Sequence, residues 1–257
     1  MKSSTQITLT ALVDIPLVRL GDNLVDIIEH SLRQSDILLY EGDVLVIAHK
    51  IVSKVEGRYV DLCQIQPTQR ACTLAIEVEK DPRLVEVILS ESSEVVRYRP
   101  GVLVVAHRLG FVLANAGVDS SNVDQESGSE QVLLLPKDPD GTCAEIRQQL
   151  KENSGSEVGV IINDSHGRAW RNGTVGVALG VAGVPALLDL RGEPDLYDER
   201  LEVTQVGLAD ELAAAASILM GQGNEGQPIV HIRGLPYPLR AGIATDLLRS
   251  KREDLFR

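Results

Sequence analysis

The segment at residues 158–173 constrains the fold more than any other stretch, because a short apolar run leads directly into polar residues. Val158-Gly159-Val160-Ile161-Ile162 has the length and composition of a buried strand. The next residues, Asn163-Asp164-Ser165-His166-Gly167-Arg168, are typical of a polar loop. Asp and Ser oxygens suit hard cations such as Mg²⁺ or Mn²⁺, and a guanidinium binds phosphate. The segment therefore predicts either an ordinary polar turn or an anchorage for a metal and a phosphate.

Composition predicts a globular protein. Hydrophobic residues make up 44% of the 257 residues and charged residues 24%, as in average folded domains. Aromatic residues are only 3%, so Val, Leu, Ile and Ala must build the core. No apolar run approaches the roughly 20 residues that cross a bilayer, and the N-terminal residues do not resemble a secretory signal. We expect no membrane partner. We also expect one unit over residues 1–257, with two interleaved lobes and no clear linker.

Cysteine content and net charge restrict the location and the partners. Cys63, Cys72 and Cys143 are too few and too scattered for a disulfide framework or a paired zinc motif. They predict structural thiols and a cytoplasmic location. The formal net charge of −12 disfavours nucleic acid, because phosphate backbones attract clustered Lys and Arg. Any bound anion therefore needs a local cationic pocket or a metal ion.

Hydrophobic periodicity predicts a mixed α/β chain of the α+β type. Extended segments are expected at residues 7–18, 44–48, 102–106, 132–135, 158–162 and 229–233, and helices at 23–33, 69–80, 82–90, 142–152 and 210–220. Residues 113–123 are expected to form a loop that ligands can approach, and residues 138–141 a turn. Residues 124–131 are expected to form an exposed acidic turn and to be the most mobile segment.

Gly176, Gly180 and Gly183 lack the strand, Gly-x-Gly-x-x-Gly turn and helix order of a dinucleotide fingerprint. We interpret them as positions of close strand packing. No Gly-x-x-x-x-Gly-Lys-Ser/Thr segment occurs, which excludes the common P-loop. The fold is therefore expected to be neither Rossmann nor P-loop.

Several cationic or glycine-rich positions have two interpretations each. Lys50 and Lys54 lie either on a solvated face or against phosphate. His49 and His166 have no partner visible in the sequence and are interpreted as ordinary loop residues, although His166 could contact substrate. The glycine-rich segment after the helix at 210–220 either ends that helix or surrounds a nucleotide.

Several segments resemble the coenzyme F420-0:gamma-glutamyl ligase family, and they occur in order from Gly42-Asp43 to the C-terminus. They include His49-Lys50-Ile51-Val52-Ser53-Lys54 and Ala114-Asn115-Ala116-Gly117-Val118-Asp119-Ser120-Ser121-Asn122. Leu134-Leu135-Pro136-Lys137-Asp138, the segment around Asp164, Ala209-Asp210-Glu211-Leu212-Ala213 and Met220-Gly221-Gln222-Gly223 complete the pattern. The resemblance implies a two-lobed fold peculiar to the family, with largely antiparallel sheets and a homodimer.

The resemblance also implies two divalent cations, Mg²⁺ or Mn²⁺, beside a bound GTP, with K⁺ as an activator. It places one metal at Asp119 and Asp164 and the other at Ser165 and Gln222. Nucleotide contacts are implied for Pro16, Leu17, His49, Lys50, Lys54, Asn122, Met220, Gly221, Gln222, Gly223, Asn224, Glu225, Gly226 and Gln227. Lys54, Arg168 and Arg171 are candidate catalytic residues that could neutralise phosphoryl charge.

The implied activity is that of a GTP-dependent amide-bond-forming ligase. It would join L-glutamate to the carboxylate of F420-0 through an acyl phosphate and then add further gamma-linked glutamate. A carboxylate is a poor electrophile, so phosphorylation would supply the leaving group that the amine displaces. The alternatives are a GTP-binding regulatory protein and a metal-dependent phosphohydrolase on the same scaffold.

Overall fold

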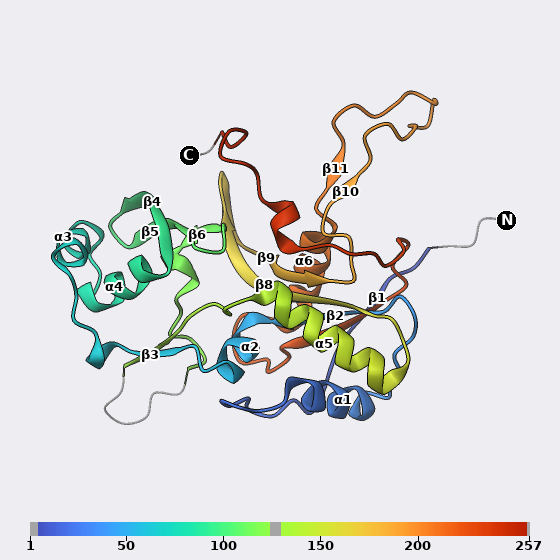
Figure 1. Cartoon of the computed structure of the whole chain (residues 1–257), viewed down its shortest axis with the longest axis horizontal. Helices are drawn as coiled ribbons and strands as arrows, with labels where there is room; N and C mark the ends of the chain where they lie inside the picture. Colours follow the sequence, from blue (N-terminus) through green and yellow to red (C-terminus); the bar gives the residue numbers. More distant parts are fainter. Residues whose placement is uncertain (1–4, 124–129, 256–257) are drawn as a thin grey trace.

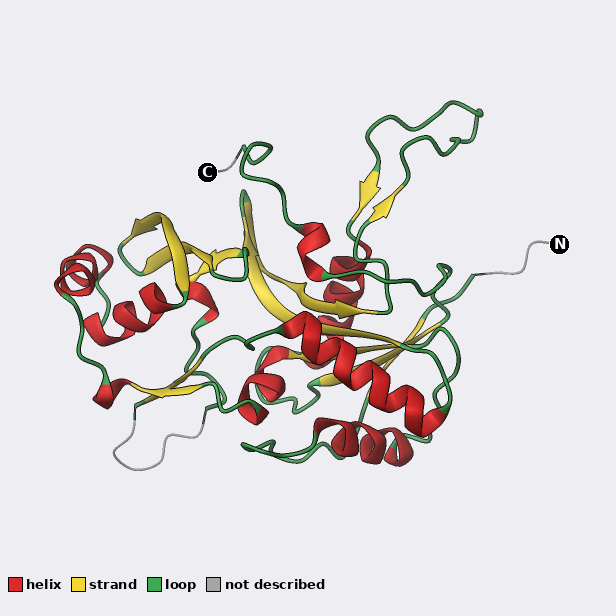
Figure 2. Ribbon diagram, viewed as in Figure 1, coloured by secondary structure: helices red, strands yellow, loops and turns green. Residues whose placement is uncertain are grey.

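The computed structural model describes residues 5–123 and 130–255, and its mixed α+β architecture confirms the predicted fold class (Figure 1, Figure 2). A five-stranded sheet with the order β1-β12-β2-β8-β9 forms the centre. Its strands are β1 (Thr8–Ala11), β2 (Val44–Ala48), β8 (Gly159–Arg168), β9 (Arg171–Ala182) and β12 (Ile229–Arg233). In this sheet β2 and β8 pair in parallel, and the other neighbours pair antiparallel.

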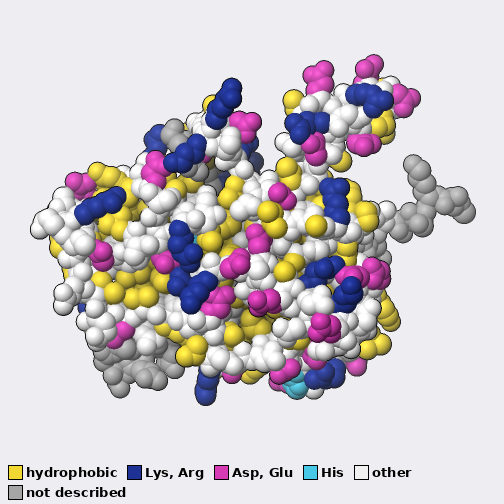
Figure 3. All heavy atoms as spheres, in the orientation of Figure 1, with side chains coloured by type: hydrophobic (Ala, Val, Ile, Leu, Met, Phe, Trp, Pro, Cys, Tyr) yellow, Lys and Arg dark blue, Asp and Glu magenta, His cyan; other side chains and the backbone are white. Residues whose placement is uncertain are grey.

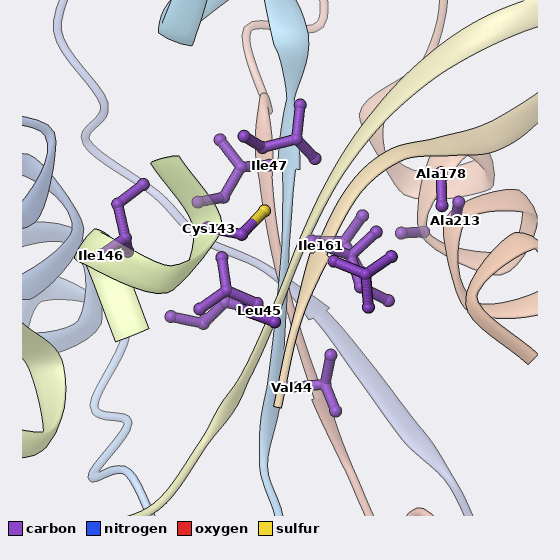
Figure 4. Close-up of a cluster of buried hydrophobic side chains, with 14 of the residues drawn as sticks. Val44, Leu45, Ile47, Cys143, Ile146, Ile161, Ala178 and Ala213 are labelled. Carbon is purple, nitrogen blue, oxygen red and sulfur yellow. The ribbon is translucent and has the colours of Figure 1, made fainter. Parts of the chain in front are cut away.

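Helices cover both faces of the central sheet, which explains why β2 is one unbroken apolar run. The first four residues of β2, from Val44 to Ile47, are fully buried. Helix α5 (Pro139–Ser154) packs on one face and α6 (Leu208–Met220) on the other. Figure 4 shows Cys143 and Ile146 of α5 on one side of the strands, and Ala213 of α6 beside Ala178 on the other. A strand buried on both faces cannot alternate apolar and polar residues.

The predicted helices are confirmed, and their ends follow capping rules. The Asn23 side chain accepts hydrogen bonds from two backbone N–H groups at the start of α1 (Leu24–Gln34). Thr68 caps α3 (Gln69–Val78), and Asp81 caps α4 (Pro82–Ser90), whose first residue is proline. The short helix α2 (His49–Val55) follows β2 directly.

Three smaller sheets surround the centre. Strands β4 (Ser92–Arg99), β5 (Val102–His107) and β6 (Val112–Ala114) form one sheet, and residues of β4 and β5 share a core cluster with α3 and α4. Strand β3 (Tyr59–Asp61) pairs with β7 (Gln131–Leu133). Strands β10 (Leu188–Asp189) and β11 (Gln205–Val206) begin an arm that projects from the body and carries charges of both signs (Figure 1, Figure 3). Single 3₁₀ turns occur at Leu62–Gln64, Asn115–Gly117 and Ala244–Leu247.

Two local predictions are wrong. Residues 138–141 do not form a free turn, because Asp138 accepts a hydrogen bond from the Gly141 N–H and caps α5, which begins at Pro139. The polar segment after Ile162 is not a loop, because β8 continues to Arg168 in antiparallel register with β9. Part of the segment predicted to be mobile, residues 124–129, lies outside the described residues. Where the chain is described, no helix is long and apolar enough to span a membrane.

An ion cluster around Glu91 joins the β4–β5–β6 sheet to the segment that follows α2. The Glu91 carboxylate accepts a hydrogen bond from Arg58 at 2.7 Å and another from Arg108 at 3.1 Å. His107 Nε2 lies 3.4 Å from the same oxygen. His107, followed by the two arginines, lowers the pKa of Glu91 from 4.5 to about 2, although burial alone raises it. Glu91 is therefore charged across the physiological pH range.

We predict that Glu91→Gln lowers the free energy of unfolding by about 2–4 kcal/mol at neutral pH, because it leaves the largely buried guanidinium of Arg58 without its counterion. The folded-state pKa is depressed, so the Glu91 contribution is complete above pH 4.5 and is lost as the pH falls toward about 2. Urea unfolding of both proteins at neutral pH and in acid should show the difference shrinking through this window. The exposed carboxylate control, Glu94→Gln, should change stability by under about 1 kcal/mol. A constant difference at all pH values would contradict the charge argument.

Candidate functional site

The site begins where the parallel pairing of β2 with β8 ends. In the β2–β8 register Ala48 lies opposite Asn163, so the next residues, His49 and Asp164, emerge at the same edge of the sheet. The Nε2 atom of His49 lies 3.2 Å from Oδ1 of Asp164. The parallel pairing thus joins two residues that are far apart in the sequence.

Two histidines flank the Asp164 carboxylate. His166 Nε2 lies 3.1 Å from Oδ2 of Asp164, opposite the oxygen that His49 approaches. The side chains of His49, His166 and Asp164 are 3%, 12% and 17% exposed. Burial raises the pKa of Asp164, but the interactions with His49 and His166 outweigh it and hold the pKa well below its ordinary value. The interpretation of these histidines as ordinary loop residues without partners is wrong, because the tertiary fold brings both to Asp164.

The residue after His49 reaches the second predicted carboxylate. The Lys50 ammonium lies 2.7 Å from Oδ2 of Asp119, and Ser121 donates hydrogen bonds to Asp119 through its N–H and its hydroxyl. Asp119 is held in place because its backbone bridges to Leu133 of β7. Burial raises the pKa of Asp119, and the hydrogen bonds from Lys50 and Ser121 lower it below its ordinary value. Asp119 and Asp164 therefore contact consecutive residues of α2.

The other predicted pair is joined by a direct hydrogen bond. Gln222 donates from Nε2 to the Ser165 hydroxyl at 2.9 Å. Gln222 reaches it because α6 ends at Gly221, whose φ of 71° favours glycine and turns the chain sharply. Ser165 directly follows Asp164, so both predicted ligand pairs lie in one neighbourhood.

The loop after α6 already holds an anion of its own. The Gly223 N–H donates to the Glu225 carboxylate at 2.8 Å. Backbone N–H groups of Glu225 itself, then Gly223 and Gln222, lower the pKa of Glu225. Successive N–H groups that converge on one point form a concavity suited to anions, including phosphate.

The remaining predicted residues lie around this cluster at different distances. Lys54 is half-buried in the last turn of α2, and Asn122 is exposed with a φ of 56°. Arg168 and Arg171 face each other at the exposed far end of the β8–β9 hairpin. Arg168 lies four residues beyond Asp164, about 13 Å along an extended strand. The structure therefore does not bring either arginine beside Asp164.

The donor chemistry of the predicted ligands fits a divalent cation. Two carboxylates, a hydroxyl and a carboxamide all offer hard oxygen atoms, which Mg²⁺ and Mn²⁺ prefer. In the conformation described here Lys50 neutralises Asp119, so a cation at Asp119 would compete with that ammonium. Within residues 5–123 and 130–255, no group of three or more His, Cys, Asp or Glu side chains is arranged to hold a metal. The predicted metal ligands therefore include the Ser165 hydroxyl and the Gln222 carboxamide in addition to the two carboxylates.

One of the surface cavities formed by described residues contains predicted residues. A cavity of about 590 Å³ is lined by Pro16 and Leu17 together with the start of α1. Another, of about 420 Å³, lies between α3 and β4 and includes none of the predicted site residues. The segment at Pro16 is therefore the better candidate for a ligand contact.

An α+β protein that gathers carboxylates, hydroxyls, a lysine and an anion-holding loop at one sheet edge is suited to an anionic ligand accompanied by a cation. Comparison with known proteins identifies the class. Residues 12–234 match the family model described as F420-0:Gamma-glutamyl ligase. The chain belongs to this family.

Curated relatives match over nearly their whole length. The chain is 47% identical over 253 residues to the coenzyme F420:L-glutamate ligase of Methanothermobacter thermautotrophicus, covering 98% of this chain and 99% of the relative. The corresponding ligase of Methanopyrus kandleri is 47% identical over 244 residues, 93% of each chain. That of Archaeoglobus fulgidus is 42% identical over 243 residues, covering 95% of this chain and 93% of the relative.

The position of Gln222 depends on how closely α6 approaches β9. Gly176 lies opposite Ser165 in the β8–β9 register, and a Cβ there would collide with the Ala213 carbonyl of α6. Gly180 likewise leaves no room beside the Pro139 carbonyl of α5. The interpretation of Gly176 and Gly180 as positions of close packing is confirmed, although the neighbours are helices rather than strands.

We predict that Gly176→Ala destabilises the protein by about 1–3 kcal/mol, because α6 must move away from β9. Urea unfolding measures the change. Gly167→Ala is the matched control, since Gly167 lies on the paired strand without a positive φ, and no neighbouring atom lies within 4 Å of the position that its new methyl group would occupy. The control should change stability by under about 0.5 kcal/mol. Equal effects of the two substitutions would refute the packing argument.

Proposed function

We propose that this chain joins L-glutamate to the carboxylate of coenzyme F420-0 in a GTP-dependent reaction and then adds further gamma-linked glutamate. The observation that carries the ligase assignment is the match of 47% identity over 98% of the chain to a coenzyme F420:L-glutamate ligase. The nucleotide dependence is supported by the cluster around Asp164 and by the anion-holding loop at residues 221–225.

The reaction has two chemical steps. A carboxylate oxygen of F420-0 attacks the γ-phosphorus of GTP, so that the bond to the β-phosphate oxygen breaks and GDP leaves. The glutamate nitrogen then attacks the acyl carbon, loses a proton and displaces inorganic phosphate, which leaves an amide. When bound, divalent cations would supply charge neutralisation between the approaching anions.

The chain's own residues have distinct proposed roles. Asp119 and Asp164 would hold one cation, and Ser165 and Gln222 the other. Lys54 would neutralise charge on the phosphoryl oxygens, and Arg168 or Arg171 would do so only if the hairpin end approaches the substrate. The N–H groups around Glu225 would receive a phosphate after the Glu225 carboxylate moves away, because both anions need the same donors.

The same proposal includes K⁺ stimulation, a homodimer and a cytoplasmic location. None of these is needed for the chemistry within one chain. The K⁺ stimulation and the homodimer follow from the family resemblance, and the cytoplasmic location follows from the cysteine pattern described above.

We predict that Asp164→Asn lowers ligation about 10²-fold or more, because it removes a buried negative charge while keeping the shape of the side chain. Purified protein is incubated with GTP, Mn²⁺, F420-0 and labelled glutamate, and mass spectrometry follows the product heavier by one glutamate. Asp36→Asn is the control, since Asp36 is exposed and its φ of 55° suits asparagine equally well. A wild-type rate in Asp164→Asn would refute the proposed metal site. GTP cleavage that is independent of F420-0 and glutamate would favour a phosphohydrolase.

We predict that removing the Lys50 ammonium strengthens the binding of a divalent cation and weakens the binding of GTP. Lys50→Gln removes the ammonium from Asp119, so Mn²⁺ binding without nucleotide should tighten about fivefold, the value of a partly exposed ion pair near 1 kcal/mol. GTP binding should weaken about tenfold, because a hydrogen bond to a charged group is lost. Electron paramagnetic resonance of free Mn²⁺ and calorimetry with GTP measure the two effects. Lys251→Gln, in an exposed pair with Glu94, is the control. No change in either constant would place Lys50 on a merely solvated face.

A further inference from the structure

The cavity of about 590 Å³ beside α1 has properties that the proposed function does not yet use. Its volume lies within the roughly 300–1,000 Å³ typical of small-molecule sites. Its lining combines apolar Pro16, Leu17 and Ile27 with the polar side chains of Arg19 and Asn23 and the carboxylates of Asp22 and Asp26. Leu17 is 86% exposed, so its apolar surface is free to cover the face of a flat ring.

Helix α2 connects this cavity to the cluster at Asp164. The Gly21 N–H donates to the Val55 carbonyl at the C-terminal end of α2, and Leu20 packs against Gly57 just beyond it. The N-terminal end of α2 carries His49 and Lys50, about 9 Å away at 1.5 Å per residue. A nucleotide whose phosphates lie near the N-terminal end could therefore extend its base toward the cavity.

The two carboxylates of the cavity differ in what they bind. Asp22 accepts a hydrogen bond from the Arg19 N–H at 2.7 Å, which holds the turn before α1. Asp26 lies exposed in the first turn of α1, and among the described residues its carboxylate makes no hydrogen bond or ion pair. Asp26 is therefore the carboxylate with both oxygens available to a ligand.

We propose that Asp26 selects guanine by accepting hydrogen bonds from the base, an inference that rests on the proposed nucleotide dependence. Guanine presents two adjacent donors, N1–H and the 2-amino group, which match the two oxygens of one carboxylate. Adenine presents an acceptor at N1, which a carboxylate repels. The carboxylate thus favours one base and disfavours the other, as specificity requires.

The test asks whether the single substitution Asp26→Asn changes the preferred nucleotide from GTP to XTP. Xanthine carries a carbonyl where guanine carries the 2-amino group, so an asparagine side chain can accept from N1–H and donate to that carbonyl. Calorimetry with GTP, XTP and ATP is carried out on wild-type protein and on Asp26→Asn in the presence of Mg²⁺. We expect GTP affinity to fall by about tenfold or more in Asp26→Asn, and XTP to become the better ligand. The Asp26→Ala substitution should weaken GTP binding without making XTP the better ligand.

Two controls separate this inference from the proposed function. Asp22→Asn tests the neighbouring carboxylate, and a switch to XTP in that variant but not in Asp26→Asn would overturn the assignment of Asp26. GTP and ATP binding equally well to the wild-type protein would also overturn it, while leaving a nucleotide-dependent ligase intact. Failure of the wild-type protein to bind any of the three nucleotides would reject the nucleotide dependence and the role of Asp26 together.

Discussion

The parallel pairing of β2 with β8 is the interaction on which the rest of the site depends. The paired apolar residues, Val44–Ile47 of β2 and Val160–Ile162 of β8, are buried on both faces under α5 and α6, and that burial fixes their register. A slip by one residue would turn Asp164 toward the opposite face of the sheet. Because the strands run in the same direction, the residues that follow the paired Ala48 and Asn163, His49 and Asp164, come to a common edge. The remaining elements add Lys50 and Gln222 to an edge that this pairing has already defined.

Basic side chains contact both carboxylates at this edge, so the local surroundings differ from those of the acidic chain as a whole. The net charge of −12 belongs to the whole surface, whereas His49, His166 and Lys50 surround the two carboxylates. Their contacts lower the pKa values of Asp119 and Asp164 in spite of burial, so both carboxylates stay ionised. An ionised, partly buried carboxylate paired with a lysine can exchange that partner for another cation. The lysine is then free to meet phosphate.

The sequence predicted the positions of helices and strands better than it predicted which of them contact each other. The strand at residues 44–48 and the helices with Asn23, Thr68 or Asp81 caps could be predicted because propensity and capping act within a few residues. Residues 138–141 were ambiguous, since Asp and Pro start helices as readily as turns. The extension of β8 to Arg168 depends on β9, and the contact of His49 with Asp164 joins distant parts of the chain. Such contacts follow from tertiary pairing, and the two apolar runs ending in polar residues were the available signal.

In the proposed function, the parts that a P-loop combines in one turn are divided between separate elements. A P-loop combines backbone N–H donors with a lysine in a single glycine-rich turn. Here the N–H donors lie after α6, around the Glu225 carboxylate, while the lysines lie on α2. The hydrogen bond from Gln222 to Ser165 links the loop after α6 to β8 next to Asp164, so a shift of α6 moves the donors relative to Asp164. The close contact of α6 with Gly176 therefore sets the spacing between the anion-binding loop and the carboxylates, a spacing that α2 alone could not define.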